Sequence, residues 1–90
     1  MVNRAGMYYE DFDRIVFPVV EAHMEEARAA IARLRQRGFS VQVAGPFEHD
    51  GATQQWNYYE VTVTGGIRLD LPKRLLAPLT IPAAEVDPEV

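Results

Sequence analysis

Residues 49–72, HDGATQQWNYYEVTVTGGIRLDLP, decide the fold that we expect for this chain. Two runs within them, QWNYYEVTVT (55–64) and GIRLDL (66–71), alternate apolar and polar side chains, which is the pattern of half-buried β-strands. Gly65 and Gly66 lie at the junction and supply the positive φ angles that a tight hairpin needs. The stretch therefore predicts a β-hairpin.

The register of this hairpin follows from the need to keep one face apolar. A three-residue loop, 64–66, pairs Val63 with Ile67 and Val61 with Leu69, whereas a two-residue turn would mix the two faces. We therefore expect these four aliphatic side chains to face the core together.

A further strand, FSVQV (39–43), precedes the hairpin and alternates in the same way. Asp50-Gly51 is suited to the turn that follows it. We expect Val43 to lie opposite Tyr59, which makes a three-stranded antiparallel meander with apolar side chains on one face.

A helix is predicted over residues 18–37, before the strands. Pro18 suits a first helical turn, and Gly38 followed by Phe39 suits a C-terminal cap in which Phe39 packs on Leu34. Acidic residues come early in this stretch and arginines late, which matches the helix dipole. Apolar residues recur at helical spacing: Phe17, Val20, Met24, Ala27, Ile31 and Leu34.

Together these elements predict a single α+β domain over 1–90, with two layers. One long N-terminal helix packs on a three-stranded antiparallel meander (αβββ), and a short helical turn within 71–82 closes the core. The ordered core is expected over about 14–81, followed by a mobile acidic tail over 82–90.

The composition is that of an ordinary globular domain. The chain has 90 residues and no cysteine, which excludes disulfides, thiolate metal sites and cysteine-based catalysis. The N-terminal residues do not form a signal peptide, and no apolar run is long enough to span a membrane, so we expect a cytoplasmic protein. Eight of the nine basic residues are arginine, which suggests a GC-rich bacterial or phage genome.

The net charge is −4, and it is unevenly distributed. Residues 28–37 carry four arginines and no acid, while both flanking regions are acidic. Such an arginine island can contact phosphates or an acidic partner, but an acidic chain repels nucleic acid at long range.

The outward face of the predicted hairpin carries Trp56, Tyr58 and Glu60, with Arg68 from the next strand. Aromatic side chains with polar tips on a surface are typical of binding hot spots. Two alternatives stay open. A terminal segment, such as MVNRAGMYY or LAPLTIP, can cover Trp56, and aromatic residues are common in strands because they pack across the ladder.

Other polar clusters give weaker signals. In the expected register Glu60 and Asp70 lie opposite each other, but such a pair is more often a solvated surface feature than a catalytic site. Glu48-His49-Asp50 are consecutive loop residues, which rarely converge on one metal ion. Ser40 has no histidine at a suitable spacing for a triad. We therefore expect no catalytic residue, cofactor or metal.

The predicted order of elements, one helix, three antiparallel strands and a short helix, is similar to that of a double-stranded-RNA-binding domain. Gly45-Pro46 with His49 is similar to the loop that follows the first strand of that family. The family's second helix begins with a lysine cluster, whereas this chain offers only Lys73 and Arg74. The chain is therefore not assigned to that family.

The sequence predicts a small acidic protein-binding module that is not an enzyme. It would act as an inhibitor or adaptor by occupying a partner surface, as phage or bacterial anti-defence proteins do, and its partner would carry a basic or mixed-charge surface. Alternatives are a homodimeric structural or regulatory protein, and a weak nucleic-acid binder that uses Arg28–Arg37. The expected partner-binding residues are Trp56, Tyr58, Glu60, Arg68, Arg33 and Arg37.

Overall fold

The computed structural model describes residues 9–11, 13–65, 70–82 and 85. These residues form an α+β fold with four strands, two α-helices and two short 3₁₀ turns. In chain order the elements are β1 (Tyr9–Glu10), β2 (Arg14–Val20), η1 (Glu21–His23), α1 (Met24–Gln36), β3 (Ser40–Asp50), β4 (Gln55–Thr64), α2 (Asp70–Leu76) and η2 (Ala77–Leu79).

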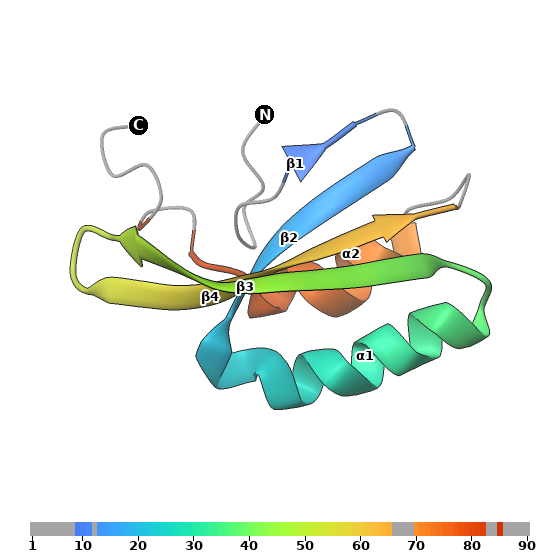
Figure 1. Ribbon diagram of the computed structural model, residues 1–90, viewed down its shortest axis with the longest axis horizontal. Coiled ribbons are helices and arrows are strands. Elements are labelled where there is room, and N and C mark those ends of the chain that lie inside the picture. Colours follow the sequence, from blue (N-terminus) through green and yellow to red (C-terminus); the bar gives the residue numbers. More distant parts are fainter. Residues whose placement is uncertain (1–8, 12, 66–69, 83–84, 86–90) are drawn as a thin grey trace.

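The four strands form one antiparallel sheet in the order β1-β2-β4-β3. Because β2 and β3 are both antiparallel to β4, they run parallel to each other on either side of it, and α1 connects them as a split βαβ unit. Both helices pack against the same face of the sheet, which gives two layers (Figure 1).

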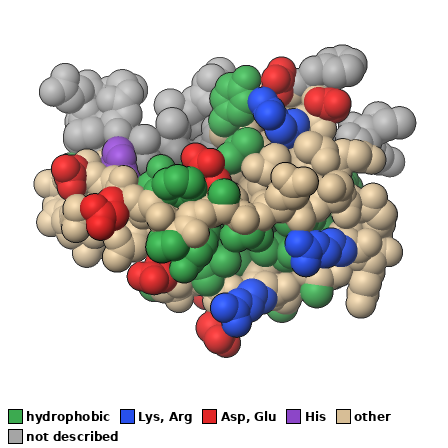
Figure 2. Space-filling model, in the orientation of Figure 1, with side chains coloured by type: hydrophobic (Ala, Val, Ile, Leu, Met, Phe, Trp, Pro, Cys, Tyr) green, Lys and Arg blue, Asp and Glu red, His purple; other side chains and the backbone are tan. Residues whose placement is uncertain are grey.

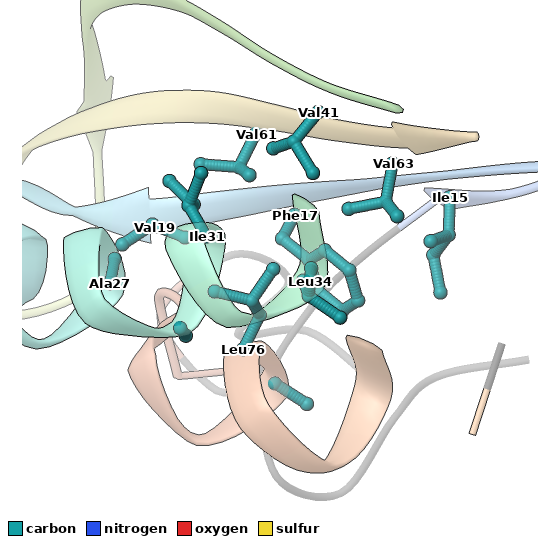
Figure 3. Close-up of a cluster of buried hydrophobic side chains, with 12 residues drawn as sticks. Ile15, Phe17, Val19, Ala27, Ile31, Leu34, Val41, Val61, Val63 and Leu76 are labelled. Atoms are coloured by element: carbon teal, nitrogen blue, oxygen red, sulfur yellow. The ribbon is translucent and has the colours of Figure 1, made fainter. Parts of the chain in front are cut away.

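The hydrophobic core lies between the sheet and the two helices (Figure 3). Phe17 stands at its centre, with no exposed surface, and pairs across the ladder with Val61. The buried members of the core are Ile15, Phe17, Val19, Ala27, Ala30, Ile31, Leu34, Val41, Val61, Val63, Leu76 and Ala77.

The prediction of a helix over 18–37 is wrong at its start, because residues 14–20 form strand β2. Proline is tolerated in this strand because of the direction of its backbone groups. The Pro18 carbonyl accepts a hydrogen bond from Ile81 N–H, at 3.1 Å, on the side away from β4. In an antiparallel strand the N–H and C=O of one residue point to the same side. The missing N–H of Pro18 therefore points away from β4 and leaves that ladder intact.

The helix itself begins at Met24 and ends as the sequence predicts. Gly38 has φ +95° and donates its N–H to Arg35 O, at 3.1 Å. The Phe39 N–H reaches Leu34 O, also at 3.1 Å. These two bonds are those of a Schellman cap.

The predicted third strand of the meander is also wrong where the structure describes it. Asp70 and Leu71 belong to α2, and residues 66–69 lie outside the described part of the chain. Pro72 occupies the first turn of this helix, where its missing N–H costs no hydrogen bond. The sheet is instead completed by β2, so the order of elements is not that of the αβββ prediction.

Strand β4 has the bounds predicted from the sequence, but its register with β3 differs by two residues. Val43 lies opposite Val61, not Tyr59, and Val41 lies opposite Val63. A shift of two residues leaves every side chain on its predicted face. The alternating valines of β3 and β4 therefore all lie on the helix side of the sheet, as expected.

Candidate functional site

Where β3 and β4 pair, the sheet face opposite the helices carries three aromatic side chains, and Tyr9 lies farther away on the same face of β1. Val61 and Val63 are buried on the helix side of β4, so Tyr58 and Trp56 point to the other side because strand residues alternate. Phe47 from β3 lies opposite Tyr58. We call Phe47, Trp56 and Tyr58 the aromatic face.

A β-bulge places Phe47 on this face. Gly45 and Pro46, joined by a cis peptide, together oppose the single residue Tyr59, so the alternation of β3 shifts by one. Gly45 has φ +128°, which L-residues rarely adopt. The bulge brings the Phe47 ring to 5.6 Å from the Tyr58 ring, with an interplanar angle of 37°, and leaves Phe47 40% exposed.

Trp56 is held by a contact that the sequence does not predict. Its indole Nε1–H donates to Glu85 Oε1 at 2.9 Å, and the Thr53 backbone N–H donates to the same oxygen at 3.1 Å. The His49 Nε2 lies 3.3 Å from the Glu85 backbone oxygen. We call this contact between Glu85 and the β3–β4 hairpin the C-terminal clasp.

The clasp fixes the charge of Glu85 and requires a small residue beside it. The hydrogen bond from Trp56, and then that from the Thr53 backbone, lower the pKa of the carboxyl below its ordinary value, against the opposing effect of burial. A Cβ on Gly51 would lie 2.5 Å from Glu85 Oε1 and 2.7 Å from Trp56 Nε1. Glycine at position 51 is therefore what allows the two side chains to meet.

The clasp bears on two expectations from the sequence. A terminal segment does contact Trp56, through Glu85, which lies beyond the LAPLTIP stretch. Glu85 also lies within the tail predicted to be mobile, yet it is only 8% exposed. Residues 83–84 and 86–90 of that tail lie outside the described part of the chain.

Of the other predicted partner-binding residues that the structure describes, only Glu60 lies on the same side of the sheet as the aromatic face. Glu60 is on the same side of β4, partly buried, between Ala44 and Pro18 in the ladder. Arg33 and Arg37 are exposed at the C-terminal end of α1, in the layer that covers the opposite face. Arg68 lies outside the described residues.

The candidate chemical clusters are likewise dispersed. Asp70 is the first residue of α2, so the predicted cross-strand pair with Glu60 does not form. Within the described residues, no three His, Cys, Asp or Glu side chains come close enough to hold a metal ion. None of the helices in this part is long and apolar enough to cross a bilayer.

A second surface feature lies between α1 and the sheet edge formed by β3. It is an open groove of about 530 Å³, and Figure 2 shows hydrophobic side chains gathered there beside charged ones. Val43 is 43% exposed on its floor. We call it the α1–β3 groove; it is lined by Glu21, Met24, Glu25, Arg28, Ile31, Arg35, Val43 and Tyr59.

Arg35 also covers part of the β3 edge. Its Nη2 donates to the Val41 carbonyl oxygen at 2.8 Å. In the described sheet β3 is an edge strand, and side chains that occupy its backbone groups reduce pairing with other chains.

Comparison of this chain with protein-family models, with curated proteins and with solved structures finds no match. The aromatic face and the α1–β3 groove are therefore the features that bear on its function.

Proposed function

We propose that this chain is a protein-binding module without catalytic activity, which acts as an inhibitor or adaptor by occupying the surface of another protein. The aromatic face is the docking surface in this proposal. The observation that carries it is the Phe47–Tyr58 pair, which the bulge presents on the face that the helices leave uncovered.

The composition of this face supports the proposal. Tyrosine and tryptophan combine a large apolar area with a polar tip, and a few such side chains commonly supply most of the binding energy of an interface. Phe47 is among the most exposed large hydrophobic residues of the described chain, at 40%. Leaving it in water is costly, and a partner that covers it removes that cost.

The charge near this face indicates the kind of partner. The chain carries a net charge of −4, and the β3–β4 hairpin beside the aromatic face is acidic: Glu48 and Asp50 are exposed there, on the other side of the strand from Phe47. Acidic groups around a docking surface speed association with a basic partner and disfavour acidic ones. We therefore propose a partner with a basic or mixed-charge surface, and not nucleic acid.

The test is affinity capture from a bacterial lysate, with and without nuclease, quantified by mass spectrometry. The test variant is Phe47→Ala/Tyr58→Ala, and the matched control is Arg33→Ala/Arg37→Ala, in the other layer. We expect a protein that wild type and the control retain and the test variant loses. Equal recovery by all three chains would contradict the proposal. Nuclease-sensitive material that only Arg33→Ala/Arg37→Ala loses would favour a nucleic-acid binder.

A further inference from the structure

We propose that the α1–β3 groove docks a second copy of this chain, so that the protein forms a two-fold symmetric dimer. This inference does not depend on the aromatic face, which lies on the opposite side of the sheet. The apolar floor of the groove and the arrangement of charge along α1 both favour such a contact.

The floor of the groove offers apolar area at a sheet edge. Val43 has 43% of its surface exposed, and Met24 and Tyr59 beside it are only partly buried. Solvated aliphatic and aromatic side chains gathered in one hollow favour the docking of a matching surface.

The charges around the groove are separated by sign. Along the chain, Glu21 of η1 and Glu25 in the first turn of α1 come first, Arg28 follows about one turn later, and Arg35 lies in the last turn. All four side chains are exposed. The groove therefore has an acidic half and a basic half, and their formal charges cancel.

A two-fold axis through such a surface matches it with itself. In an isologous contact the same patch is used by both copies, and when the two-fold axis is perpendicular to α1 the two facing helices run antiparallel. The acidic half of one groove then faces the basic half of the other, twice. The polarity along α1 thus provides charge complementarity for a second copy, which a uniformly acidic or basic partner would not satisfy.

The position of Arg35 defines which parts make contact. Because its guanidinium occupies the Val41 carbonyl, at 2.8 Å, continuous pairing of two β3 edges is blocked at that residue. The proposed contact is therefore between the α1 helices and the Val43 side chains, not a sheet that continues across the dimer.

The size of the molecule sets the scale of the contact. Stable interfaces bury roughly 800 Å² on each partner. The whole surface of this chain is 5900 Å². One open groove is a small part of that surface, so we expect a dimer whose population depends on protein concentration. Because charged side chains pair across the contact, the dimer should also weaken with salt.

The test uses two charge-reversed chains and sedimentation velocity over a range of concentrations. The first chain, Glu21→Arg/Glu25→Arg, has only arginines around the groove. The second, Arg28→Glu/Arg35→Glu, has only glutamates there. Each chain alone should dimerise on the order of tenfold less tightly than wild type, and an equimolar mixture should recover association as a heterodimer.

A matched control separates this contact from a general effect of net charge. Glu48→Arg/Asp50→Arg changes the net charge from −4 to 0, as the first reversed chain does, but alters the hairpin instead of the groove. The control should dimerise at least as tightly as wild type. Circular dichroism should show every chain folded before its mass is interpreted.

A second variant tests the apolar floor. Val43→Lys places a charge on an already exposed position, and it should leave the chain folded but monomeric. Wild type that stays monomeric at all concentrations, a dimer unaffected by Val43→Lys, or a reversed mixture that fails to associate would each overturn the proposal.

Discussion

The replacement of Phe17 by alanine tests the central departure of the structure from the sequence-based fold. In the structure Phe17 is a strand residue with no exposed surface, at the middle of β2. In the predicted fold it stands just before the first turn of a helix, at the end of the apolar stripe. The matched control is Phe47→Ala, because Phe47 is in the same sheet but on its opposite face and 40% exposed.

The expected magnitudes follow from burial. Replacing a fully buried phenylalanine with alanine costs about 3–5 kcal/mol, since it removes apolar contacts and leaves a cavity. A domain of this length has a free energy of unfolding of roughly 5–13 kcal/mol, so the loss is a large share. Phe47→Ala removes an exposed ring and its contact with Tyr58, and it should cost at most about 1.5 kcal/mol.

The assay is urea denaturation followed by far-ultraviolet circular dichroism, with the Trp56 fluorescence as a second probe. The two variants should have the m-value of wild type and differ in the midpoint. In a separate thermal melt, the melting temperature of Phe17→Ala should be lower than that of wild type by at least roughly 12 °C. Equal costs for the two phenylalanines, or a cost below about 1.5 kcal/mol for Phe17→Ala, would refute the placement of Phe17 in the core.

Three further outcomes are expected. Gly51→Ala should open the C-terminal clasp, because the added Cβ would lie 2.5 Å from Glu85 Oε1. The NMR signal of the single indole N–H should then move toward its solvent-exposed position. A signal that does not move would contradict the clasp. The clasp should also be lost in acid, because the Glu85 carboxyl has a pKa below the ordinary value of 4.5. Its contribution to stability is present above pH 4.5 and disappears as the pH falls through the lowered pKa. The indole signal should follow this titration in wild type and should not follow it in Glu85→Gln. In thermal melts, Gly45→Ala should destabilise the chain more than Gly38→Ala. Both glycines have positive φ, but of the two only Gly45 would bring its added Cβ against neighbours, at 3.2 Å. Equal losses of stability in the two variants would argue against the bulge.

The sequence predicts those elements whose signals are local. Strand β4 follows from the alternation of Tyr59, Val61 and Val63 between two sets of turn residues. The C-terminal end of α1 follows from Gly38 and Phe39, because a Schellman cap involves only residues within one helical turn.

Strand β2 is not predicted because its apolar residues fit both the spacing of a helix and the alternation of a strand. Phe17 and Val20 continue the helical spacing of α1, and Pro18 is acceptable both in a first helical turn and in a strand. The fact that decides between them is that the Pro18 carbonyl, and with it the side of the missing N–H, points to Ile81 and away from β4. That contact joins residues far apart in the chain, and no local pattern contains it.

The candidate site is only partly predictable for the same reason. Trp56 and Tyr58 can be placed on one face by alternation alone. Phe47 cannot, because the bulge at Gly45-Pro46 changes the alternation of β3; the Gly-Pro pair within a strand is the one signal of it. Glu85 resembles any acid of a solvated tail, and only the folded chain brings it to Trp56.

The most direct test of the proposed docking surface is photo-cross-linking through p-benzoylphenylalanine at position 47, in a nuclease-treated lysate. p-Benzoylphenylalanine replaces the Phe47 ring with another aromatic group, at the exposed edge of the aromatic face. We predict a discrete adduct with a second protein, which is absent when the same residue is placed at position 33. An identical set of adducts from both positions, or no adduct from position 47, would contradict the proposal that the aromatic face binds a protein partner.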